Sequence, residues 1–147
     1  MSELAEKLED DMQILLVGEA DENINHEKII KAGFTNDTQK LAKMYSVSDA
    51  YVHLSTADTF GKVIAEALSC GTPAVVYNTT ACPELVVDGC GEIVELHDID
   101  GVISGLSKIK DNGKDFYSVN CRKRVEENFN YENNITQTLD LYNNLLR

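Results

Sequence analysis

Residues 58–76 read DTFGKVIAEALSCGTPAVV, and this stretch decides the fold class. After Gly61, apolar residues recur at the spacing of one helical face, namely Val63, Ile64, Ala67 and Leu68. The Gly-Thr-Pro sequence at 71–73 ends that helix. The continuous apolar run that follows at 74–77 is typical of a parallel strand covered on both faces. The stretch therefore predicts a helix that leads directly into a buried strand.

Outside this stretch, further apolar runs predict strands over residues 13–17, 28–32, 49–54 and 92–95. Helices are predicted over residues 2–11, 37–46, 83–86, 98–110, 114–128 and 131–146, with Thr35 or Asn36 capping the second of them. Strands alternate with helices, and no two-residue hairpin turn joins two strands. The sequence therefore predicts an α/β fold, a Rossmann-like parallel sheet flanked by helices, as one domain over residues 1–147.

The composition excludes several classes of function. The chain of 147 residues has 13 basic and 25 acidic side chains and a net charge of −12, which argues against binding to nucleic acid or to anionic lipid. Nine of the acidic side chains lie in residues 1–27, against a single lysine, so the segment is interpreted as a solvated helix face and an acidic loop. No apolar stretch approaches the ~20 residues of a membrane span. Four cysteines without a Cys-x2-Cys pair are interpreted as reduced thiols of a cytoplasmic protein.

The loops that follow the predicted strands are the places where an open parallel sheet binds ligands. The loop before the helix of residues 62–69 is the most informative, because it carries Asp58 and then Gly61. The N–H groups and positive dipole end of that helix would suit a phosphate or diphosphate. Glu66, about one turn into the helix, leans back toward the same place and could accept hydrogen bonds from sugar hydroxyls. The alternative is that Glu66 is a plain surface residue and Asp58 an ordinary cap.

These residues also carry a resemblance to a known family. Two acidic residues separated by seven others, followed by Ala-Leu-x-x-Gly-x-Pro at 67–73 and Asn-Thr-Thr-Ala-Cys-Pro-Glu at 78–84, resemble the donor-binding half of GT-B glycosyltransferases. The large retaining family 4 has this pattern, and the resemblance runs from about residue 12 to 110. It implies the C-terminal half of a GT-B fold. It also implies transfer of a sugar from a nucleotide diphosphate sugar to a hydroxyl acceptor, in the biosynthesis of a polysaccharide such as a capsule.

The resemblance assigns roles to matching positions only. Glu66 takes the place of the acidic residue that binds the nucleotide ribose, and Asp58 that of the residue that contacts the donor sugar, where the family usually has a longer glutamate. These two are the expected catalytic residues. The remaining matches are expected to bind the donor sugar, the diphosphate or the base: Gly18, Gly33, Phe34, Phe60, Gly61, Lys62 and Val63. No metal or other cofactor is expected, since family members of this type usually need none.

One part of the family pattern is absent. The donor domain of the family usually opens with a strand, an arginine and a lysine that clamp the diphosphate, whereas the residues before Gln13 hold no arginine and only Lys7. The chain is therefore expected to be truncated at its N-terminus. The expected missing partner is the N-terminal acceptor-binding domain, without which this chain alone is expected to bind nucleotide sugar weakly and to be inactive.

Other interpretations stay open. One is a non-catalytic module that binds nucleotides or sugar phosphates. Another, less favoured, is a sugar-nucleotide epimerase of the same two-domain architecture, for which a different arrangement of carboxylates is expected. His53 is interpreted as a packed strand residue rather than a catalytic one, and Cys82, which lies near the expected site, as an unreactive thiol rather than a reactive one. Tyr45 and Tyr51 are interpreted as core aromatics rather than base-stacking platforms. No Gly-x-Gly-x-x-Gly or Walker A loop points to NAD or ATP.

Overall fold

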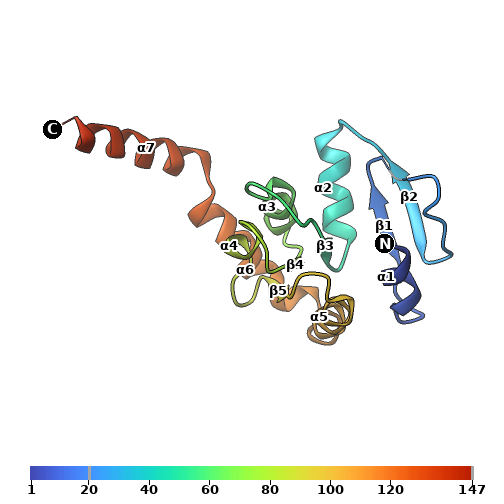
Figure 1. Cartoon of the computed structure of the whole chain (residues 1–147). Coiled ribbons are helices and arrows are strands. Elements are labelled where there is room, and N and C mark those ends of the chain that lie inside the picture. The colour runs from blue at the N-terminus through green and yellow to red at the C-terminus, as the bar shows by residue number, and fades with distance from the viewer. Residues whose placement is uncertain (20, 147) are drawn as a thin grey trace.

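A computed structural model describes residues 1–19 and 21–146 (Figure 1). Its elements, in chain order, are α1 (Ser2–Lys7), β1 (Ile14–Val17), β2 (Ile29–Gly33), α2 (Thr38–Val47), β3 (Tyr51–His53), α3 (Lys62–Ser69), β4 (Ala74–Tyr77), α4 (Cys82–Leu85), β5 (Gly91–Val94), α5 (Ile99–Asn112), α6 (Lys114–Asn128) and α7 (Tyr131–Leu145). This order confirms the predicted α/β fold, in which parallel strands are flanked by helices.

The strands of the described residues form two parallel sheets. One has the order β1-β2, with Ile14 opposite Ile29, and the other has the order β3-β4-β5, with Val52 opposite Val75. Figure 1 shows the β1-β2 pair standing apart from the larger sheet. The helix α2 connects β2 of the first sheet to β3 of the second, as expected for a crossover between parallel strands.

The hydrophobic core lies around β4. All four residues of this strand are buried, because β3 and β5 flank it and helices cover its faces. The buried side chains of α3 are Ile64, Ala67 and Leu68, as the helical spacing predicts, and α3 packs closely on α6. Val63 is 36% exposed, so the prediction that it points inward is wrong: it lies in the first turn, at the open end of the helix.

Two predicted elements are clearly shorter in the structure and one predicted helix cap is a different residue, while the other element boundaries agree to within two residues. The first helix ends at Lys7 rather than residue 11, because Leu8 adopts extended backbone. The third strand is confined to Tyr51–His53. The cap of α2 is Asp37, not Thr35 or Asn36, since the Asp37 side chain accepts hydrogen bonds from the backbone N–H groups of the first helical turn.

The C-terminal helix differs from the rest of the fold. Every described residue of α7 is exposed, and Figure 1 shows the helix leaving the body of the protein. Within residues 1–19 and 21–146, no helix is both long and apolar enough to cross a bilayer.

Candidate functional site

The loop between β3 and α3 is ordered by Asp58. Its Oδ1 atom accepts hydrogen bonds from the backbone N–H of Phe60, at 3.0 Å, and of Gly61, at 2.7 Å. These two bonds, with a smaller contribution from His53, hold the pKa of the Asp58 carboxyl below its ordinary value, so the group is a carboxylate at neutral pH. Gly61 has φ of +81°, a left-handed conformation that a residue with a side chain adopts only under strain.

The N-terminus of α3 is open to an anion. Gly61 is the N-cap and has no side chain, and its carbonyl accepts from Ile64 and Ala65. The N–H groups of Lys62 and Val63 have no acceptor within the described part of the chain. Two unsatisfied donors at the positive end of a helix dipole form a site of the kind that binds phosphate. The Lys62 side chain is also exposed there and adds a positive charge.

Glu66 lies on the exposed side of α3, one turn further along the chain. The hydroxyl of Tyr45, which comes from α2, donates to Glu66 Oε2 at 3.4 Å. Burial raises the pKa of Tyr45 well above its ordinary value, so this phenol keeps its proton. The contact orients the Glu66 carboxylate. The sequence pattern around Tyr45 indicates a core aromatic and does not reveal this contact.

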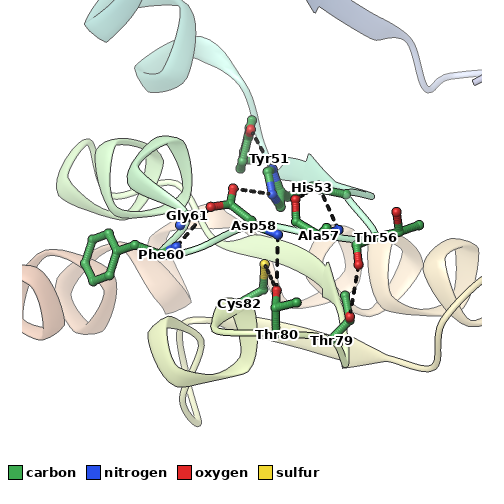
Figure 2. A network of polar contacts seen from close by, with 11 residues as sticks. Tyr51, His53, Thr56, Ala57, Asp58, Phe60, Gly61, Thr79, Thr80 and Cys82 are labelled. Atoms are coloured by element: carbon green, nitrogen blue, oxygen red, sulfur yellow. Dashed lines mark hydrogen bonds and ion pairs between the residues drawn. The ribbon is translucent and has the colours of Figure 1, made fainter.

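His53, the last residue of β3, reaches the second oxygen of Asp58 (Figure 2). Its Nε2 lies 3.2 Å from Asp58 Oδ2 without forming a hydrogen bond, and its Nδ1 lies 3.3 Å from the Tyr51 hydroxyl. The His53 side chain is only 12% exposed. It is therefore a packed strand residue, as interpreted, but one that contacts a candidate catalytic carboxylate.

A second loop braces the first. The backbone N–H of Asp58 donates to Thr80 Oγ1, and Thr79 Oγ1 donates to the carbonyl of Thr56, as Figure 2 shows. Cys82 lies beneath this contact and is buried, and its burial raises the thiol pKa. A raised thiol pKa argues against a reactive thiolate at this position.

The predicted residues of the first sheet form a separate group. Gly18 N–H donates to the Gly33 carbonyl at 3.0 Å, so these two glycines meet at the ends of β1 and β2. Phe34 follows them and is 69% exposed. Within the described residues, no hydrogen bond or ion pair joins this group to the loop of Asp58. The structure thus brings together the predicted residues from 58 to 66. Gly18, Gly33 and Phe34 form a second cluster at the ends of β1 and β2.

Aromatic contacts link the site loop to the end of α6. The Phe60 ring packs edge to face on Phe129, with centroids 5.6 Å apart, and the Arg124 guanidinium lies 5.1 Å from the centre of the Phe129 ring. Arg124 also donates to the backbone carbonyl of Glu84 at 2.6 Å. No motif indicated this support, because its members are far apart in the sequence.

A cavity and the absence of a metal site among the described residues complete the description of the candidate sites. A cavity of about 440 Å³ opens between β5, α5 and α6, beside the Glu92–Lys108 ion pair and Phe116. It shares no lining residue with the Asp58 loop, and the chemistry of its lining does not resemble an anion site. Among residues 1–19 and 21–146, no group of three or more His, Cys, Asp or Glu side chains is placed to hold a metal ion.

Known proteins are similar to this chain in sequence. The chain is 31% identical over 112 residues to the O-antigen chain mannosyltransferase B of Escherichia coli, which covers 75% of the chain and 29% of that protein. It is 28% identical to the N-acetyl-alpha-D-glucosaminyl L-malate synthase of Bacillus anthracis, over 93% of the chain and 39% of that protein. The chain therefore spans about a third of the length of these relatives.

Solved structures agree on the fold. Sucrose-phosphate synthase from Thermosynechococcus elongatus superposes with a TM-score of 0.76 at 24% identity, over 91% of this chain and 38% of that one. The Anabaena protein HepE in complex with UDP superposes with a TM-score of 0.75 at 23% identity, over 93% of this chain and 43% of that one. The family described as glycosyl transferases group 1 matches residues 1–129. The chain belongs to the group 1 glycosyltransferase family, and its fold is that of the C-terminal half of a GT-B enzyme.

Proposed function

We propose that this chain is the donor-binding half of a glycosyltransferase that transfers a sugar from a nucleotide diphosphate sugar to a hydroxyl acceptor. Membership of the group 1 family supports this assignment, as do the names of the relatives, which include a mannosyltransferase and a galactosyltransferase of Escherichia coli. Related structures were solved with UDP and with UDP-glucose, which supports a nucleotide sugar as the ligand.

The open N-terminus of α3 is the observation that carries the proposal. The free N–H groups of Lys62 and Val63 would bind the diphosphate, with the backbone of Phe60 and Gly61 lying along it. They would stabilise the negative charge that develops on the leaving nucleotide when the bond to the sugar breaks. Backbone donors at a helix end can do this without net positive charge, which is consistent with a chain of net charge −12.

The two carboxylates would hold the neutral parts of the donor. Glu66 is exposed one turn from the diphosphate position, where it could accept hydrogen bonds from the ribose hydroxyls. Asp58 Oδ1 already accepts two backbone N–H groups, so we expect contact with the donor sugar through Oδ2. Gly18, Gly33 and Phe34 would border the diphosphate and the base from the other sheet.

Finer features of the reaction are part of the same proposal. Retention of configuration and a mechanism without a bound metal follow the family resemblance. We place the reaction in the cytoplasm, which the four free cysteines support. The product would be a polysaccharide or glycan, for which the O-antigen relative gives a parallel and a capsule is one example.

We also propose that the complete protein supplies one more parallel strand, between β1 and β3, and an acceptor-binding domain. In a doubly wound sheet of strand order 3-2-1-4-5-6, the first strand lies between the second and the fourth. The sheets β2-β1 and β3-β4-β5 reproduce the two outer parts of this order, and among residues 1–19 and 21–146 no strand pairs with the second edge of β1 or of β3. The relatives, of which this chain spans about a third, are long enough to contain both parts.

The nucleotide assignment is tested by titrating the chain with UDP and with GDP in a calorimeter. Glu66→Ala is expected to weaken binding of the better nucleotide at least about tenfold, since a hydrogen bond to a charged group contributes roughly 1.5–3 kcal/mol. Glu6→Ala removes the same charge from an exposed position of α1 and should leave the affinity unchanged. Equal affinity of the Glu66→Ala variant and the unchanged chain would overturn the ribose assignment.

A further inference from the structure

A continuous series of side chains connects the two candidate carboxylates. Asp58 Oδ2 lies 3.2 Å from His53 Nε2, and His53 Nδ1 lies 3.3 Å from the Tyr51 hydroxyl. The Tyr51 ring packs edge to face on Tyr45, with centroids 5.6 Å apart, and the Tyr45 hydroxyl donates to Glu66 at 3.4 Å. We refer to His53, Tyr51 and Tyr45 as the carboxylate bridge.

From this arrangement we infer that the carboxylate bridge positions both acidic residues, with His53 and Tyr51 holding Asp58 and Tyr45 holding Glu66. The three are positioning residues, because each would act on the ligand through a carboxylate. The inference deepens the proposed function and rests on it for the ligand. It adds that side chains from β3 and α2 fix the spacing between Asp58, which would contact the sugar, and Glu66, which would contact the ribose.

The proton positions in the bridge follow from its surroundings. Burial raises the pKa of Tyr51 to about 12, and that of Tyr45 is raised as well, so each phenol has one proton to donate. The Tyr45 proton goes to Glu66. A carboxylate next to His53 Nε2 favours a proton on that nitrogen, and in the neutral ring Nδ1 is then the acceptor for the Tyr51 hydroxyl. The contacts of Tyr51 with His53 and of Tyr45 with Glu66 thus each have a donor and an acceptor, whereas the two tyrosine rings meet by packing alone.

The bridge also suits the shorter acid at position 58. The family usually has glutamate there, and an aspartate has one methylene less with which to reach a ligand. Two backbone N–H groups hold Oδ1 of Asp58 toward Gly61, and His53 approaches Oδ2 from the other side. Figure 2 shows the carboxylate between the loop and the strand. A carboxylate held on both sides has little freedom to swing away from the donor, so less entropy is lost on binding.

Titrations of His53 variants with a nucleotide sugar such as UDP-glucose test the inference, because the donor sugar is the part that Asp58 is proposed to contact. His53→Leu is expected to weaken binding of the nucleotide sugar about tenfold, whereas His53→Gln, which can donate and accept at similar places, should stay within about threefold of the unchanged chain. His97→Asn is the control, since His97 is an exposed histidine after β5 and asparagine tolerates its left-handed backbone. Thermal melting of every variant checks that it folds.

A double-mutant cycle separates positioning from packing. If His53 acts through Asp58, His53→Leu combined with Asp58→Asn should bind no more weakly than Asp58→Asn alone. Independent, multiplying losses would overturn the inference, as would an unchanged affinity of His53→Leu.

A readout without ligand distinguishes failure of this inference from failure of the proposed function. The ¹⁵N NMR shifts of the neutral His53 ring should show the proton on Nε2, and Tyr51→Phe should shift the Nδ1 signal. A proton on Nδ1 would overturn the bridge even if nucleotides bind as proposed. A proton on Nε2 in a chain that binds neither UDP nor GDP would support the bridge and contradict the proposed function.

Discussion

Both sheets of this protein are parallel, but the β3-β4-β5 sheet has a central strand that is buried along its whole length and the β1-β2 pair has no such strand. All four residues of β4 are buried, whereas β1 and β2 contain no fully buried residue, and Leu15, Val17 and Ile30 are 37%, 36% and 49% exposed. A parallel sheet normally has both faces covered. The difference teaches that the β3-β4-β5 sheet can hold a binding loop rigidly, and that the β1-β2 pair depends on further contacts.

The comparison explains where the site is well formed. The loop that carries Asp58 follows β3, is braced by Thr79 and Thr80 after β4, and leads into the buried helix α3. The cluster of Gly18 and Gly33 lies at the ends of two half-exposed strands, which pair with each other and with no further strand of the described part of the chain. An isolated pair of strands is marginally stable at best. We therefore expect the donor to be bound mainly by the first of these clusters in this chain.

The largest expected effect is the difference in the free energy of unfolding between a truncation in the β3-β4-β5 half and one in the β1-β2 pair. Leu68→Ala in α3 should lower the free energy of unfolding by about 2–5 kcal/mol, because Leu68 is fully buried and its removal leaves a cavity. Leu15→Ala makes the same chemical change in β1, where the side chain is 37% exposed, and should cost less than about 1 kcal/mol. Urea denaturation of both variants measures the two values. Equal losses would remove the distinction between the sheets.

Hydrogen exchange provides the next test. Amides of β4 should exchange only on global unfolding, whereas those of β1 and β2 should open at a lower free energy. In β1, Ile14 and Gly18 donate toward β2, so the N–H groups of Leu15 and Val17 face the unpaired edge and should exchange fastest. Mass spectrometry or NMR follows both sets. Protection of Leu15 and Val17 in a longer protein would support the proposed additional strand, and their protection in this chain alone would contradict it.

The smallest expected effect depends on pH. The pKa of Asp58 is lowered in the folded protein, so its hydrogen bonds add stability above the unfolded carboxyl pKa, and that stability is lost as the pH falls through the folded value. Asp58→Asn should thus lower the melting temperature at pH 7, and the difference should shrink below about pH 4. Asp10→Asn, a fully exposed change before β1, is the matched control. A difference that stays constant down to pH 2 would show that charge is not the cause.

The sequence predicted the elements well because their signals are local. The run at 74–77 and the helical spacing of Ile64, Ala67 and Leu68 each report on burial within a few residues of the chain, and the structure confirms them. Asp58 and Glu66 could be singled out for the same reason, since both belong to one loop and one helix. Their roles stay predictions.

Contacts between distant segments could not be predicted in this way. Tyr45 reaches Glu66 from 21 residues away, and Arg124 reaches Glu84 from 40. The separation into two sheets could not be predicted from local patterns either, because each strand pattern is equally consistent with one continuous sheet. Which edge a strand pairs with depends on packing across the whole domain, and no local pattern records it.

NMR mapping of nucleotide binding tests the central claim most directly. When UDP or GDP is added to the ¹⁵N-labelled chain, the account predicts that the largest amide shifts fall on Lys62 and Val63, with smaller shifts from Asp58 to Glu66. Glu66→Ala should weaken the binding without moving its location. Shifts confined to the cavity beside Lys108 and Phe116, with none at the start of α3, would contradict the claim that the helix N-terminus binds the donor.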